Sequence, residues 1–164
     1  MSPQEQLLQT ADFAAAQARL VPDLREARPW LVISSVLLAQ QAAALALNLA
    51  GDAIPRQVGA TELLLRAASR DRLPPPHTLA FSGRARLDFD RLNETRNALM
   101  HPRGLPLPVG DETLARGLPV VAAIARQLLL VQPFDGLDLP VDAVARLRFS
   151  LEELEALAEY LASV

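Results

Sequence analysis

Residues 30–51 read Trp-Leu-Val-Ile-Ser-Ser-Val-Leu-Leu-Ala-Gln-Gln-Ala-Ala-Ala-Leu-Ala-Leu-Asn-Leu-Ala-Gly, and this stretch decides the fold class. It contains no charged residue and is rich in Leu and Ala, which are strong helix formers. A membrane span here would place Gln40 and Gln41 near the middle of the bilayer, where lipid cannot satisfy their amides. We therefore expect a central helix that is packed on several sides, with a membrane anchor over residues 30–50 as the alternative.

Helical patterns continue on both sides of this stretch. On the N-terminal side we expect a helix over residues 3–20 and a charged connector over residues 25–29. On the C-terminal side we expect a short helix over residues 60–70, with Thr61 as a candidate N-cap, and a proline-rich loop over residues 71–84.

The second half of the chain predicts further helices, separated by proline. One covers residues 86–101, and another covers residues 111–132 with Asp111 as its cap. Pro119 should kink the second of these helices or split it in two. Residues 133–140 form another break between two prolines.

The end of the chain contains a possible capping box, Ser150-Leu-Glu-Glu153, which predicts a last helix over residues 150–162. Residues Arg146–Phe149 could be extended, but no partner strand is evident. The length of the chain favours one domain over residues 1–164. Together these patterns predict an all-α bundle of four to six helices.

Composition excludes several kinds of site. Hydrophobic residues make up 51% of the chain and charged residues 21%, as in a globular protein. The absence of cysteine excludes disulfides and Cys-based zinc sites, and it fits a reducing cytoplasm. The two histidines form no cluster with acidic residues at metal-ligand spacing, so we expect no metal and no cofactor.

Charge is unevenly distributed along the chain. The net charge is −3, which gives no overall basic signature for nucleic acid. Between Arg56 and Arg103, however, nine arginines face five acidic residues. This positive excess indicates either an anionic partner or a chance segregation of solvated charges.

The helix predicted over residues 86–101 carries the polar residues of most chemical interest. Asn93, Asn97 and His101 are four residues apart and form one stripe, while Arg96 lies at its border with the core side. A partly desolvated guanidinium there could bind phosphate strongly. His101 ends the helix before a proline, where its backbone leaves the α region and its ring can turn outward. Histidine is the side chain best suited to proton transfer at neutral pH.

The sequence Arg96-Asn-Ala-Leu-Met-His101 resembles the motif of the HEPN family. That motif is an Arg, then a polar residue that is often Asn, then a His after four to six intervening residues. The resemblance implies a helical bundle that forms a homodimer, in which the two motifs meet and cleave RNA without metal through its own 2′-hydroxyl. Arg96, Asn97 and His101 would then be catalytic. In a toxin branch of the family a Tyr that an antitoxin modifies follows the His by two positions; here that position is Arg103, which argues against such regulation.

The alternative interpretation of the same residues is structural. Arg96 would then pair with Glu94 or another surface acid, Asn97 would be solvated and His101 would cap its helix. Further candidate contacts to RNA are polar residues around the motif, each of which could equally be an ordinary surface residue: Asn93, Arg103, Arg84, Arg86 and Arg91. His77, in the proline-rich loop, is better explained as an exposed loop residue than as a second proton carrier.

The function predicted first is a homodimeric, metal-independent endoribonuclease of the cytoplasm, with RNA as substrate, no membrane contact and a possible antitoxin protein as partner. Its place in a toxin–antitoxin or defence system follows from the family resemblance alone. The second hypothesis is a non-catalytic HEPN-like module that binds a protein or nucleotide. The third is a small membrane-anchored helical protein.

Overall fold

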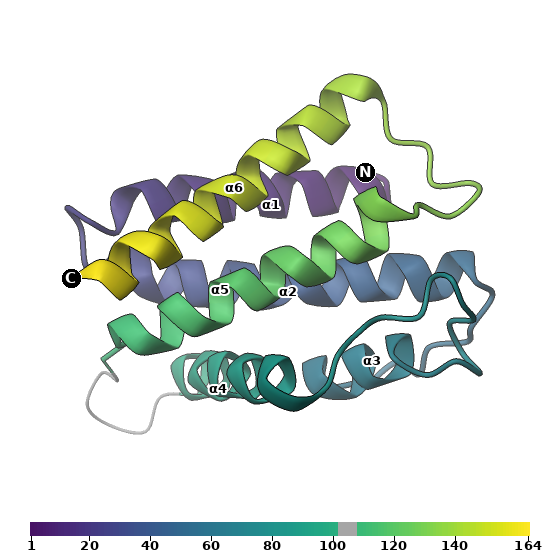
Figure 1. Ribbon diagram of the computed structural model, residues 1–164, viewed down its shortest axis with the longest axis horizontal. Helices are drawn as coiled ribbons and strands as arrows, with labels where there is room; N and C mark the ends of the chain where they lie inside the picture. The colour runs from purple at the N-terminus through teal and green to yellow at the C-terminus, as the bar shows by residue number, and fades with distance from the viewer. Residues whose placement is uncertain (102–107) are drawn as a thin grey trace.

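The computed structural model describes residues 1–101 and 108–164, and in these residues it contains helices and no strands (Figure 1). The helices are α1 (Pro3–Leu20), α2 (Ala27–Leu49), α3 (Ala60–Ala67), α4 (Gly83–Met100), α5 (Asp111–Arg126), a π-helical turn η1 (Gln127–Val131) and α6 (Val141–Ser163). The predicted all-α fold, with four to six helices, is therefore confirmed.

Helix α2 is the centre of the fold. It packs against α1, α3, α4 and α5, and η1 also contacts it. Helices α1 and α2 form one layer and α5 and α6 lie across it, with α4 beside both α2 and α5 (Figure 1). The apolar composition of residues 30–51 is explained by this position, because a helix packed on several sides is hydrophobic all round.

Two segments are long and apolar enough to cross a membrane by length and composition: α2 and the run Asp111–Val131. Within the fold, 67% of the apolar window of α2 is buried, against 50% for the second segment. The two serines of α2 are buried too, and their hydroxyls donate to helix carbonyls, Ser34 to Trp30 O at 2.7 Å and Ser35 to Val32 O at 3.1 Å. Core packing thus accounts for the two serines as well as for the apolar residues of α2.

The connector predicted over residues 25–29 is shorter than expected, because α2 already begins at Ala27. Arg28 is not a solvated charge but is 8% exposed. Its guanidinium donates to Val109 O at 2.8 Å and pairs with Asp111 Oδ1 at 2.7 Å. Asp111 is the first residue of α5 rather than its cap, a position that Gly110 takes. Arg28 therefore ties the start of α2 to the start of α5.

Helix α5 runs through Pro119 without splitting, so that part of the prediction is wrong, while the alternative, a kink, stays a prediction; the helix continues into η1. Ten residues before η1, at Gly117, α5 packs against the predicted motif helix. A Cβ at Gly117 would lie only 3.1 Å from Leu92 Cβ of α4, a buried residue. Glycine at this crossing therefore allows α5 and α4 to approach closely.

Two further predicted caps are wrong, although the helix predicted from residue 60 does start there. The sequence Ser150–Glu153 does not open a helix, because α6 begins nine residues earlier, directly after Pro140, and includes the segment 146–149 that could have been extended. Ser150 is instead buried in the middle of α6. Thr61 is not the N-cap of α3, since Gly59 precedes the helix and the Thr61 hydroxyl donates to Asp90 Oδ1 of α4 at 2.8 Å.

Candidate functional site

The candidate site is built around Arg96, in the second half of α4. Its guanidinium donates to three side-chain amide oxygens: Asn93 Oδ1 at 2.9 Å, Asn97 Oδ1 at 3.0 Å and, more weakly, Gln40 Oε1 at 3.5 Å. The two asparagines are on α4 itself, where residues one and three positions away can reach the same side chain. Gln40 comes from α2, so the packing of α4 on α2 completes the set.

The charge of Arg96 is not neutralised within the part of the chain that the structure describes. No carboxylate oxygen there lies within salt-bridge distance of Arg96, whereas eight such pairs involve other arginines. Burial lowers the pKa of Arg96 from its ordinary value, because desolvation disfavours the charged form. A guanidinium is nevertheless always protonated in proteins. Arg96 is thus a partly desolvated cation held by neutral groups, and the expected pairing with Glu94 is not found.

His101 is the residue that caps α4. Its backbone has φ −128° and ψ 63°, outside the α region, as predicted for the residue before Pro102. Its N–H still donates to Asn97 O at 3.1 Å, and the side chain is exposed. His101 is five positions after Arg96, which on a regular helix corresponds to about 7.5 Å along the axis and about 140° around it. The two residues therefore share the end of α4 but not one face of the helix, and the His101 side chain is exposed to a ligand.

Asn97 and Asn93 hold the guanidinium of Arg96. Asn97 Oδ1 accepts the hydrogen bond from Arg96 Nε, and Asn93 Oδ1 accepts one from Arg96 Nη2. The catalytic role that the family resemblance implies for Asn97, and the contact to RNA predicted for Asn93, stay predictions.

Three of the arginines proposed as RNA contacts do not join the cluster. Arg84 and Arg86 lie in the first turns of α4 and pair with acids one turn ahead, Asp88 at 3.2 Å and Asp90 at 3.8 Å. Arg91, five positions before Arg96, lies about 140° around the helix axis from it, as His101 does on the other side. Arg103 falls outside the described residues. Of the four predicted contacts that the structure describes, only Asn93 is placed beside Arg96.

His77 is neither a part of this cluster nor an ordinary exposed loop residue. Its ring stacks on Phe134 with centroids 3.8 Å apart. The same loop is held by Gln127, whose amide accepts from Ala80 N–H at 3.0 Å and donates to Thr78 O at 2.9 Å. The histidine thus helps to fix a loop against the end of α5 and the segment after η1.

Gln40 is the site residue that sequence analysis missed. Gln40 and Gln41 interrupt the apolar run of α2, and this was used only as an argument against a membrane span. A polar pair within a core helix is also a sign that something polar packs there. The two glutamines could therefore have indicated that α2 makes a polar contact, but not that the partner is Arg96.

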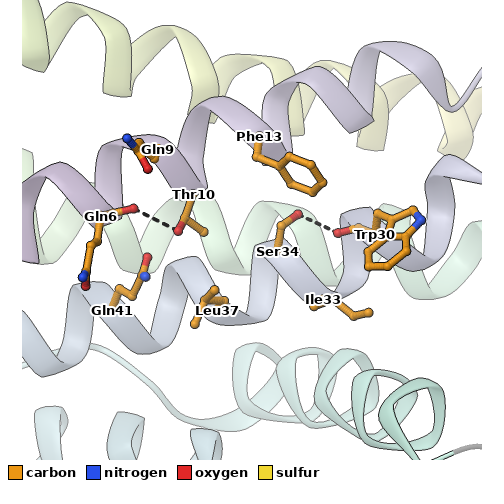
Figure 2. Close-up of a pocket in the computed structure, with 9 residues that line it drawn as sticks. All are labelled: Gln6, Gln9, Thr10, Phe13, Trp30, Ile33, Ser34, Leu37 and Gln41. Atoms are coloured by element: carbon orange, nitrogen blue, oxygen red, sulfur yellow. Dashed lines mark hydrogen bonds between the residues drawn. The ribbon is translucent and has the colours of Figure 1, made fainter. Parts of the chain in front are cut away.

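A groove between α1 and α2 lies close to the cluster, since Gln41 lines it and Gln40 contacts Arg96. Its cavity volume is about 550 Å³. Figure 2 shows Phe13 and Trp30 toward one end and three glutamines toward the other. The lining residues are Gln6, Gln9, Thr10, Phe13, Trp30, Ile33, Ser34, Leu37 and Gln41.

Comparison with known proteins adds no relative: no protein-family model, no curated protein and no solved structure matches the chain. The resemblance to the HEPN motif therefore stays a hypothesis that depends on Arg96, Asn97 and His101 in their helical setting. Within residues 1–101 and 108–164, no three His, Asp or Glu side chains are grouped as a candidate metal site.

Proposed function

We propose that the chain is a metal-independent endoribonuclease of HEPN type, with a composite active site formed by two copies. The observation that carries the proposal is the state of Arg96, a cation that is partly desolvated, hydrogen-bonded to amides and free of any carboxylate in the described chain. Such a group has its charge available for an anion. Its fork of donors matches the oxygens of a phosphate.

The reaction would be transesterification within RNA. The 2′-oxygen forms a bond to the adjacent phosphorus and loses its proton to a base, while the bond from phosphorus to the 5′-oxygen breaks and that oxygen takes up a proton. The products are a 2′,3′-cyclic phosphate and a 5′-hydroxyl end. Arg96 would stabilise the charge that develops on the phosphorane oxygens, and His101 would transfer a proton.

A second copy supplies what one chain lacks. Each chain has one candidate proton carrier at the site, His101, whereas the reaction needs a base and an acid. Two motifs related by a two-fold axis would provide two imidazoles and two guanidiniums. Asn93 and Asn97 would act in each copy as positioning residues for Arg96, because their amide oxygens fix its guanidinium.

The test is RNA cleavage by the purified chain in EDTA, compared with Arg96→Ala and His101→Ala. We expect fragments with 2′,3′-cyclic phosphate ends, and loss of cleavage in both variants. The matched control is Arg148→Ala on α6, an exposed arginine remote from α4 in sequence, which should cleave normally. Absence of cleavage across varied RNAs would contradict the proposal and favour the non-catalytic binding module. Cleavage that persists in both variants would contradict the site.

The biological setting is proposed by family analogy alone. A ribonuclease of this kind would belong to a toxin–antitoxin or defence system in the cytoplasm, with an antitoxin protein as partner. Expression that arrests growth, and that Arg96→Ala relieves, would support this setting. Growth unaffected by the active enzyme would argue against it.

A further inference from the structure

The exposed surface of the α1–α2 groove carries no charge. None of its nine lining residues is Asp, Glu, Lys or Arg, although one residue in five of the whole chain is charged. The charged residues of α1 lie elsewhere on the helix: Asp12, for example, pairs with Arg146 of α6. Depletion of charge is characteristic of the centre of a protein–protein interface.

Large apolar side chains protrude around this groove. Trp30 is 57% exposed, Phe13 46% and Leu37 41%, and all three line it (Figure 2). Trp and Phe are enriched at interfaces and are frequent anchors of binding energy. Exposure of these two aromatic side chains to water is therefore unfavourable, and a protein partner that covers them would remove that apolar area from water.

One hydrogen-bonding group of a lining residue is unsatisfied. Gln41 Oε1 is buried and accepts no hydrogen bond within the described chain. A donor of the occupant would reach this oxygen only after the Gln41 side chain turns toward the groove.

We infer that the occupant is a second copy of this chain. The Trp30 side chain of each copy would be seated in the groove of the other. The surface supplies both parts of such a contact: the exposed Trp30 ring, and a groove with a cavity volume of about 550 Å³. A two-fold axis brings like residues near one another, so an uncharged face avoids self-repulsion between chains of charge −3.

The position of the groove agrees with this occupant. Gln41 of the groove and Gln40 of the Arg96 cluster are neighbours on α2. Helix α4 runs antiparallel to α2, so its His101 end points toward the Trp30 end of α2 (Figure 1). That a pair of chains joined here is also the pair that forms the composite site rests on the proposed function; the interface itself does not.

Trp30 is the only tryptophan, so the fluorescence of the native chain reports on this interface directly. We expect sedimentation to show a dimer at micromolar concentration, and the emission maximum of Trp30 to shift to longer wavelength on dilution. Leu37→Arg on α2 and Phe13→Arg on α1 should each weaken association at least about tenfold and give long-wavelength emission at all concentrations. The matched control is Leu87→Arg, a leucine of α4 that is 58% exposed and does not line the groove, which should behave like the native chain.

Two results would overturn the inference: a monomer at every accessible concentration, or a dimer whose Trp30 emission and stability are unchanged by both groove variants. Circular dichroism excludes misfolding as the cause of dissociation. The outcome is separable from that of the ribonuclease proposal. A dimer through the groove that cleaves no RNA supports the interface and contradicts the activity. Cleavage by a monomer contradicts both the interface and the composite site, whereas a cleaving dimer that the groove variants leave intact contradicts the interface alone.

Discussion

Arg96 on α4 and Arg126 at the end of α5 are both partly buried arginines. They differ in the groups that accept hydrogen bonds from their guanidiniums. Arg126 makes a bidentate pair with Glu155 of α6, at 2.6 and 2.5 Å, and this hydrogen bonding raises its pKa. Arg96 has only amide oxygens, and burial lowers its pKa. The first arginine is satisfied by the fold. The second is positioned by the fold but keeps its charge for something outside the chain.

The largest expected effect is on activity. Arg96→Ala should reduce the rate of RNA cleavage by about 100-fold or more, since removal of one group that stabilises the transition state has effects of that order. The free energy of unfolding of this variant should change by no more than about 0.5 kcal/mol, because no ion pair in the described chain is lost. Single-turnover cleavage and urea unfolding measure the two quantities.

Arg96→Lys is the informative control for that prediction. It keeps the charge but loses the planar fork that Asn93 and Asn97 hold, so cleavage should recover only in part. Full recovery would show that charge alone matters and that the amide contacts are incidental. A loss of stability of several kcal/mol in Arg96→Ala would make Arg96 structural, like Arg126.

The next largest effect is on stability, at Arg28. This arginine extends the comparison, because it is buried and its two terminal nitrogens join α2 to Val109 and Asp111, whereas its Nε has no partner in the described chain. Arg28→Met removes both bonds and leaves Val109 O without its donor, which should cost about 2 kcal/mol. Urea unfolding is the measurement, with Arg148→Met as an exposed control expected within about 0.5 kcal/mol. Equal free energies of unfolding for the two variants would show that the contacts of Arg28 with Val109 and Asp111 do not stabilise the fold.

A smaller effect is expected where α5 crosses α4. Gly117→Ala gains about 1 kcal/mol of helix propensity but places a methyl group 3.1 Å from Leu92 Cβ, and overpacking of this kind costs about 1–3 kcal/mol. We expect a net loss of about 1 kcal/mol in urea unfolding. The loss should be reduced when Leu92→Ala is introduced as well, since the two changes share one contact. A gain in stability for Gly117→Ala would mean that α4 moves aside freely.

The helices could be predicted from the periodicity of apolar residues, but the residue at which each helix begins could not always be predicted. Ser2–Glu5 and Ser150–Glu153 share the pattern Ser-x-x-Glu. At Ser2 it forms a true capping box, in which Ser2 Oγ accepts from Glu5 N–H at 3.1 Å and Glu5 accepts from Ser2 N–H at 2.8 Å. At Ser150 the apolar spacing already continues from Ala143 and Leu147, and the hydroxyl is buried in mid-helix. A cap therefore depends on what precedes it, which the four-residue pattern does not contain.

The candidate site divides in the same way between local and distant contacts. Asn93, Arg96 and Asn97 share one helix, so their proximity follows from their spacing and was predicted. Gln40 is 56 positions from Arg96, and it meets the guanidinium only because α4 packs against α2 at one particular height. The satisfaction of Arg84 and Arg86 by acids one turn ahead is also local. It could have been predicted from i,i+4 spacing, which would have removed both from the proposed RNA contacts.

The smallest expected effect compares the two arginines most directly, through double-mutant cycles. The pair Arg126–Glu155 is partly exposed, so its coupling energy should be about 1 kcal/mol and should fall as salt is added. The pair Arg96–Asn93 should couple by about 0.5 kcal/mol in the free protein, the lower end for a hydrogen bond, because Asn97 and Gln40 still accept from the guanidinium when Asn93 is removed. Addition of a non-cleavable 2′-deoxy oligonucleotide should raise the second coupling, measured by binding, and leave the first unchanged. An Arg96–Asn93 coupling as large as that of Arg126–Glu155 without ligand would mean that the amides satisfy Arg96 fully, and that its charge is not held in reserve for a phosphate.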